Sequence, residues 1–396
     1  MRNQELILYG SSLLFNFALS MSGLLVPLLC ISMGLSAFQI GLVVSSQAFI
    51  QVPLRLMSGI ITARYGEKRM LVFSFGTMAV ATAAFACSTG AVWWGLMFIQ
   101  LIMGLSRMSY WSPSQSYASK IGGDRKAAVL GRLTSYVNFG MVSGLLLGGV
   151  SAFYLGYKWS FLICSLFALI SLLLVAFLPA IAGGAGRKTF RDIFRPLPGL
   201  LRLRPLYLSG LAAHSSAFVI ALTFSFFPIL FQSIGYEERY IGFFNALRPL
   251  AVVFLGFLFG MLIARWGTKR LFFAGMLGMG VCLAAAPALT SVWSIVPNML
   301  VLGCCSGIIY IIYQTIVAEH SDEQNRAVSY SISGTFYSLA HVTAPTLFGI
   351  LTDWLGIGEA FRIGGVLFIA IALLTQPLFA ILIPKSRPSL ARAEEA

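Results

Sequence analysis

The sequence predicts an all-α membrane protein of 12 transmembrane helices in two six-helix pseudo-repeats. Three observations predict this class: an apolar composition, twelve apolar windows of membrane-spanning length, and an internal repeat. Of the 396 residues, 58% are apolar and 10% are charged, whereas roughly 25% of the residues of a soluble domain are charged. Cores of ordinary size cannot hide so many apolar side chains, so we expect them to face lipid.

The apolar windows are long enough to cross a bilayer, which needs about 20 mostly apolar residues. We expect twelve spans, at approximately 6–31, 39–62, 70–88, 92–118, 128–153, 159–181, 206–233, 240–264, 270–289, 292–317, 328–355 and 360–384.

The basic residues orient these spans. Most of the 27 Lys and Arg fall in the tails and in the loops that follow even-numbered windows, whereas only Lys158, Arg239 and Arg362 fall in the other loops. The positive-inside rule therefore places both termini in the cytoplasm. The net charge of +14 is then a property of topology and of contact with the lipid bilayer, and no nucleic-acid partner is expected.

The chain also divides into two similar halves. A basic cytoplasmic linker, residues 182–205, separates an N-terminal six-helix bundle (1–181) from a C-terminal six-helix bundle with a short cytoplasmic tail (206–396). A shift of 201 residues places the stretch 59–69 on 260–270 and Pro27 on Pro228. Equal span numbers and a constant shift indicate parallel repeats related by an axis along the membrane normal.

The repeated stretch resembles a loop signature of the major facilitator superfamily of secondary transporters. That signature is Gly, three residues, Asp, Arg, any residue, Gly, any residue and two basic residues, and here Ala63 and Ala264 stand where the family has Asp. The resemblance covers essentially the whole chain and points to the 12-span efflux subgroup of proton antiporters. It implies a role in gating for Gly59, Arg64, Gly66 and Arg69 in the first half and for Gly260, Arg265, Gly267 and Arg270 in the second.

A glycine pattern in the window 128–153 resembles the exporter subgroup as well. Gly140, Gly144, Gly148 and Gly149 have the family's spacing, with Leu145 where the family has Pro. Glycines four residues apart also allow close helix packing without any gating role. We expect an exporter, with an organic-anion uptake symporter, a lipid flippase or a multidrug efflux pump on the same scaffold as alternatives.

Three arginines lie inside predicted spans: Arg55, Arg107 and Arg248. A charge at the centre of a membrane helix costs at least about 2.5–3.5 kcal/mol, and the windows contain no acidic residue in their central parts. An electropositive cavity favours an anionic or zwitterionic small molecule, which Arg can bind through carboxylate or phosphate. Other polar residues at helical spacing outline the same cavity: Asn16, Gln47, Gln51, Asn245, Tyr310, Gln314 and Tyr337.

Proton coupling requires a titratable group, and His214 and His341 are the candidates within the spans, because an unperturbed histidine titrates near pH 6.5. No motif for a nucleophile, a P-loop or a metal site occurs in the sequence, so we expect neither an enzyme nor a cofactor or metal. The expected protein acts as a monomer in the bacterial cytoplasmic membrane and moves a small amphipathic compound outward in exchange for protons.

Overall fold

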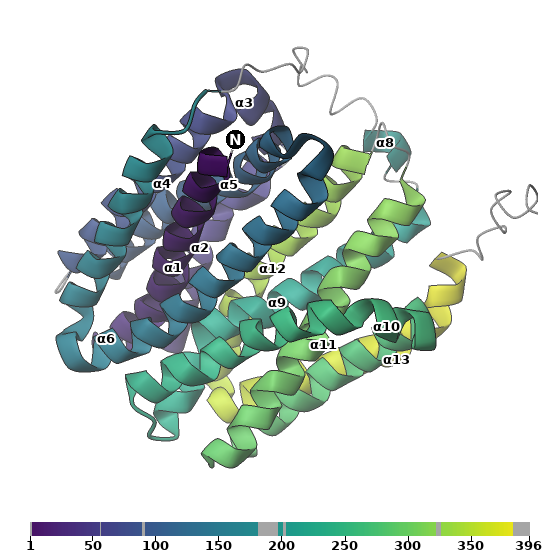
Figure 1. The fold of residues 1–396 in the computed structure, drawn as a ribbon. Helices are drawn as coiled ribbons and strands as arrows, with labels where there is room; N and C mark the ends of the chain where they lie inside the picture. The colour runs from purple at the N-terminus through teal and green to yellow at the C-terminus, as the bar shows by residue number, and fades with distance from the viewer. Residues whose placement is uncertain are drawn as a thin grey trace, which may run out of the picture.

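The computed structural model describes residues 2–55, 57–88, 92–180, 197–200, 203–321 and 326–382. Over these ranges the chain is almost entirely helical and contains no strand. The helices are α1 (Arg2–Ser32), α2 (Ala37–Arg55), α3 (Ser58–Tyr65), α4 (Glu67–Ala86), α5 (Trp93–Gly122), α6 (Lys126–Ala176), α8 (Leu197–Leu200), α9 (Arg204–Ser233), α10 (Glu238–Ala285), α11 (Val292–His320), α12 (Arg326–Leu355) and α13 (Ile357–Leu382). Figure 1 shows the two halves as neighbouring bundles, the first in purple to teal and the second in green to yellow.

Length and hydropathy are sufficient for a membrane crossing in eight of the described helices. Two of these, α6 and α10, have 51 and 48 residues and are interrupted at Gly156 (φ 77°) and Gly267 (φ 72°). A straight helix of that length would measure about 75 Å, more than twice the hydrocarbon core of about 30 Å. Both bends lie between windows that the sequence predicts as separate spans. The all-helical membrane class is therefore confirmed, while the count of twelve spans and the cytoplasmic termini stay predictions.

Glycines in the left-handed region mark the repeat in the backbone itself. Seven described glycines have positive φ, a conformation that glycine adopts without the steric cost paid by other residues. Shifts of 200 or 201 residues pair Gly34 with Gly235, Gly66 with Gly267, and Gly156 with Gly356. The two halves thus turn at equivalent places. Most of the predicted linker, 182–196 and 201–202, lies outside the described residues, as do residues 383–396 of the tail.

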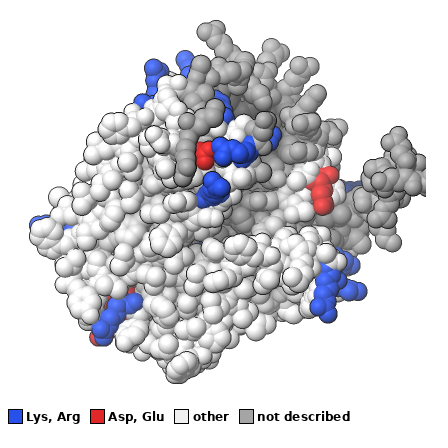
Figure 2. Space-filling view, in the orientation of Figure 1, with Lys and Arg blue, Asp and Glu red and all other residues white. Residues whose placement is uncertain are grey.

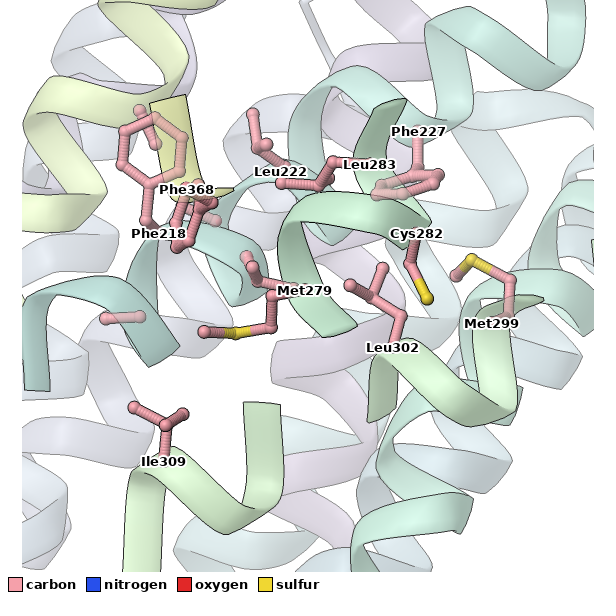
Figure 3. Close-up of a cluster of buried hydrophobic side chains, with 14 of the residues drawn as sticks. Phe218, Leu222, Phe227, Met279, Cys282, Leu283, Met299, Leu302, Ile309 and Phe368 are labelled. Carbon is pink, nitrogen blue, oxygen red and sulfur yellow. The ribbon is translucent and has the colours of Figure 1, made fainter. Parts of the chain in front are cut away.

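Each half has an apolar core. In the first half, the ring of Phe15 on α1 lies 4.8 Å from that of Phe75 on α4 and 4.4 Å from that of Tyr110 on α5, between ring centroids. In the second half, α9, α10, α11 and α13 contribute the buried residues drawn in Figure 3, among them Phe218, Leu222, Met279, Leu283, Leu302 and Phe368. A rigid movement of one half against the other would leave most of this packing intact.

The outer surface is strongly apolar. On the face shown in Figure 2, charged side chains are few and lie in the upper part of the view and near its edges, and a broad uncharged area covers the rest of the described surface. Large apolar side chains are exposed on it or on other faces, including Phe177 (77%), Phe257 (83%) and Trp293 (90%). A surface of this kind suits lipid rather than water.

The halves meet mainly along two helix pairs, α2 with α12 and α6 with α10, and α1 also contacts α9. Glycines bring the backbones together in both pairs. A Cβ added to Gly41 would collide with the carbonyl oxygen of Pro345, and one added to Gly149 would collide with the carbonyl oxygen of Glu238. We call this part of the bundle, formed by residues 33–41, 149–157, 234–242 and 349–357, the sealed end. Farther along α10, Gly256 and Gly260 face open space.

Candidate functional site

Arg248 lies on α10 and is only 4% exposed. Its Nη1 donates a hydrogen bond to the Ser306 Oγ on α11, 3.4 Å away, while its Nε has no partner among the described residues. Asn245, one turn earlier and on the same face, is fully buried, and neither its Oδ1 nor its Nδ2 has a described partner. Buried polar atoms are almost always hydrogen-bonded in folded proteins, so these atoms leave hydrogen-bonding capacity that the described residues do not use.

Arg107 lies on α5 in the other half of the molecule. Its Nη1 donates to the Gln47 Oε1 on α2 at 3.1 Å, and its Nε has no partner in the described part of the chain. Gly104 makes this pairing possible, because any Cβ there would collide with the carbonyl oxygen of Gln47. Gln51 completes the row by donating to that same carbonyl oxygen at 3.2 Å.

Tyr337 on α12 contacts one of the three arginines and lies within electrostatic range of the other two. The guanidinium of Arg55 lies 5.7 Å from the centroid of the Tyr337 ring, and Tyr337 also interacts electrostatically with Arg107 and Arg248. Gly334, one turn earlier, leaves room for Arg55, whose Nε would be only 2.9 Å from an added Cβ. Cations from α2, α5 and α10, and hence from both halves, thus lie within electrostatic range of one tyrosine.

The arginines have neutral partners among the described residues. Gln47, Ser306 and the Tyr337 ring occupy part of their surfaces. Within the described ranges, neither Arg107 nor Arg248 has an acidic partner, because the ion pairs there join Lys120 to Glu67, Arg125 to Glu5, Arg239 to Glu237 and Arg362 to Glu359. The charge of this region is therefore not neutralised by the ion pairs of the described residues.

The two candidate histidines differ. His341 is 7% exposed; its Nδ1 lies 3.2 Å from the carbonyl oxygen of Tyr337, and its Nε2 has no described partner. It interacts electrostatically with Arg55 and Arg107. His214 lies between α9 and α12, with Nδ1 3.3 Å from the carbonyl oxygen of Phe336 and Nε2 3.4 Å from the Thr343 Oγ1. Only His341 combines a place beside the arginines with an unoccupied ring nitrogen.

Other predicted residues lie around this centre. The Tyr310 and Tyr337 ring centroids are 6.2 Å apart, and Gln314 donates to the Tyr313 hydroxyl at 3.5 Å. Asn16 is fully buried in the first half, where its Nδ2 donates to the Tyr110 hydroxyl at 3.0 Å. Its Oδ1 has no partner among the described residues, and a role for Asn16 in binding stays a prediction.

Sequence reasoning missed Ser306 and Tyr313. Ser306 accepts a hydrogen bond from Arg248, and Tyr313 interacts electrostatically with Arg55. A signal for Ser306 was present, since it precedes Tyr310 and Gln314 by four and eight residues and so shares their face of the helix. Tyr313 is directly beside Gln314 in the chain and carried no periodic signal.

The glycines of α6 divide between the two bundles. Gly140, Gly144 and Gly148 touch α1 in the same half, where an added Cβ would meet atoms of Leu13, Phe17 and Met21. Only Gly149 touches the other half, through Glu238 and Gly242 on α10. Close packing explains the first three, and a role in gating stays a prediction for all four.

The loop signature adopts similar turns in both halves. Gly66 and Gly267 have φ angles of 84° and 72°, which is why the frame requires glycine there. Gly59 lies in α3 and Gly260 in α10, while the basic residues Arg64, Arg69, Arg265 and Arg270 are exposed. Arg64 lies 5.7 Å from the centroid of the Tyr65 ring. Their predicted gating role remains a prediction.

Two apolar hollows lie elsewhere, on α6 and its contact with α1. Their volumes are about 490 and 320 Å³, and both are lined by Leu155 and Ile163. Trp159, in the lining of the larger one, is 60% exposed. Neither hollow includes one of the arginines, so these features of the apolar surface do not compete with Tyr337 as the centre of the candidate site.

Comparison with known proteins assigns the fold to a family. The family model described as Major Facilitator Superfamily matches residues 8–237 and 209–396. Among curated relatives, the class D tetracycline resistance protein of Salmonella ordonez is 22% identical over 85% of this chain and 87% of its own length. A probable sugar efflux transporter of Helicobacter pylori (strain G27) is 24% identical over 83% of each.

Solved structures agree on the fold. The nucleoside transporter NupG covers 97% of this chain and 100% of its own, with a TM-score of 0.79 and 13% identity. A bacterial homologue of the human lysosomal transporter Spinster, in an inward-facing and unoccupied conformation, covers 98% of both chains with a TM-score of 0.80 and 16% identity. At these identities the likeness is one of fold.

Proposed function

Because the chain belongs to the Major Facilitator Superfamily, it is a multi-pass transporter of the bacterial cell membrane with a small-molecule substrate, and we propose that it exports a small amphipathic anionic or zwitterionic compound in exchange for protons. Transport would proceed as residues 1–181 and 206–396 of a monomer rock against each other. The family assignment also confirms the expectation that the chain is not an enzyme. Export is supported by the efflux and resistance names of its relatives.

One observation carries the choice of substrate charge: Arg107 and Arg248, from opposite halves, are both within electrostatic range of Tyr337 and have no acidic partner among the described residues. A guanidinium binds a carboxylate through two parallel hydrogen bonds, and both arginines keep an Nε without a described partner. A carboxylate placed between them would interact with both halves at once. Asn245 would then hydrogen-bond a neutral polar group of the same compound.

We infer that the charge of the substrate beside His341 decides whether substrate and proton move in opposite directions or together. Antiport requires substrate and proton to exclude each other, which follows if an ammonium group of a zwitterion occupies the place beside His341. A purely anionic substrate would instead favour protonation of His341, since coupling between two ligands is reciprocal. That outcome favours the second candidate function, uptake of an organic anion together with a proton.

The experiment is substrate-driven proton movement in proteoliposomes that contain a trapped pH-sensitive dye. Panels of monocarboxylates, amino-acid-like zwitterions and lipophilic cations would be tested under gradients of defined direction. We expect zwitterions to move protons opposite to themselves. Movement in the same direction would establish the symport candidate, and flux that ignores the pH gradient would eliminate proton coupling.

Substitution of Arg248 tests the charge argument. Arg248→Ala should weaken binding of carboxylates about 10-fold or more, because one charge-assisted hydrogen-bonded pair of about 1.5–3 kcal/mol is lost, while Arg248→Lys should restore part of it. Arg362→Ala is the matched control, because Arg362 is an exposed cation that pairs with Glu359 on α13. Equal carboxylate binding by wild type and Arg248→Ala would refute the assigned substrate charge.

A further inference from the structure

Asp353, near the end of α12, lies across the boundary between the halves against the first turn of α2. Its Oδ1 accepts the backbone N–H of Ala37 at 2.9 Å, and its Oδ2 accepts that of Phe38 at 3.1 Å. Asp353 and Ala37 are 316 residues apart in the chain. One carboxylate of the second half thus caps a helix of the first.

The first turn of α2 explains why this carboxylate fits. The initial N–H groups of a helix lack partners within the helix. Ser36 and Gln39 form a capping box, in which the Gln39 N–H donates to the Ser36 Oγ at 3.3 Å and the Ser36 N–H donates to the Gln39 Oε1 at 2.9 Å. The Ile40 N–H reaches the Ser36 carbonyl oxygen at 2.9 Å. The two remaining donors are those of Ala37 and Phe38, and Asp353 accepts both.

Two further features strengthen the contact. The N-terminal end of a helix carries partial positive charge, so it attracts a carboxylate beyond the hydrogen bonds themselves. Gly349, one turn before Asp353, lets α12 approach closely, because a Cβ there would lie 2.8 Å from the carbonyl oxygen of Ala37. On the other helix, a Cβ on Gly41 would collide with the carbonyl oxygen of Pro345.

We propose that Asp353 is a conformational latch, whose contact with the N-terminus of α2 holds the sealed end shut and must break before that end can open. Asp353 and Phe38 are already exposed, so when the contact breaks, water takes over the hydrogen bonds of the two N–H groups and the carboxylate. The latch therefore biases the closed state over the open one without locking it. Because it acts between helices and away from the arginines, it applies whichever compound is carried and in whichever direction.

Spin-label distances across the sealed end test this latch without a substrate. Trp94 is the second residue of α5 in the first half and Trp293 is the second residue of α11 in the second half, and their side chains are 61% and 90% exposed. Labels at Trp94→Cys and Trp293→Cys, in a full-length protein with its six native cysteines replaced, report the separation of the halves by double electron–electron resonance in lipid nanodiscs. Asp353→Asn should raise the ratio of the long-distance to the short-distance population about 5- to 10-fold, as expected for loss of one charged cap.

Glu359→Gln is the matched control. Glu359 is an acidic residue on the same side of the same half, but its partner Arg362 lies within α13, so its substitution should leave the distance distribution unchanged. Asp353→Glu, which keeps the charge, should retain part of the short-distance population. A distribution for Asp353→Asn that matches wild type, or an equal shift with Glu359→Gln, would overturn the latch.

Discussion

The two helix pairs that close the sealed end share close packing at glycines and differ in the polar contact that joins them. The internal repeat places Gly41 on Gly242 and Gly149 on Gly349, and in both pairs these glycines bring backbones into contact. Beyond the glycines, α12 fastens to α2 through a carboxylate on backbone N–H groups. The α6–α10 pair uses side chains only: the Tyr157 hydroxyl donates to the Glu238 Oε1 at 3.1 Å.

Arginine and aromatic groups complete the α6–α10 pair. The guanidinium of Arg239 lies 4.6 Å from the centroid of the Phe153 ring, and the repeat shift places Phe153 on Asp353. A close approach of backbones depends on the absence of a Cβ, so both halves keep glycine there. The fastening depends on individual side chains, so equivalent positions can hold an acid in one half and an aromatic ring in the other.

The largest effect is expected from substitutions of the glycines at which the helix backbones pack. Gly149→Val and Gly349→Val each drive a side chain into a facing backbone, and overpacking costs typically 1–3 kcal/mol, which corresponds to about a 5- to 150-fold loss of the closed state. The same pair of spin labels should show the short-distance population depleted in both variants. Gly131→Val is the control, because nothing lies within 4 Å of its added Cβ. If only one of the two glycines matters, the pairs do not share a mechanism.

A smaller effect is expected from the side-chain fastening. Tyr157→Phe removes one hydrogen bond to a carboxylate, worth about 1 kcal/mol in a partly exposed setting, and should lower the closed population about 5-fold. Tyr236→Phe provides the comparison, because Tyr236 lies at the same end but donates within its own half, to the Thr290 carbonyl oxygen at 2.7 Å. An equal shift in both variants would show that general destabilisation, and not the link between the halves, is responsible.

The smallest effect concerns Arg239. Arg239→Gln loses a cation–π contact of about 0.5–1 kcal/mol at an exposed site, so the closed population should fall about 2- to 5-fold in the same measurement. Arg362→Gln, which removes a cation of the same end from a pair within α13, should leave it unchanged. A loss as large as that of Gly149→Val would mean that the α6–α10 pair depends on this cation more than on its glycines.

The sequence predicted which arginines belong to the candidate site better than it predicted which residues contact them. Arg107 and Arg248 stood out in the sequence because charges are costly within a span. Their partners Gln47 and Ser306 depend on which helices Gly104 and Gly303 bring together. Helical spacing indicated Asn16 as well as Gln47, but spacing shows only which residues share a face; it does not show that Asn16 hydrogen-bonds Tyr110 or that Gln47 hydrogen-bonds Arg107.

Composition and periodicity alone determined the all-helical membrane class, because the helical period and the length of an apolar run are local properties of the chain. The repeat, too, was visible in the sequence and reappears as pairs of positive-φ glycines. Tertiary structure decided that Gly148 faces its own bundle while Gly149 faces the other, and that Asp353 caps α2. Such contacts join segments hundreds of residues apart, so they depend on how whole helices are placed, which no local pattern records.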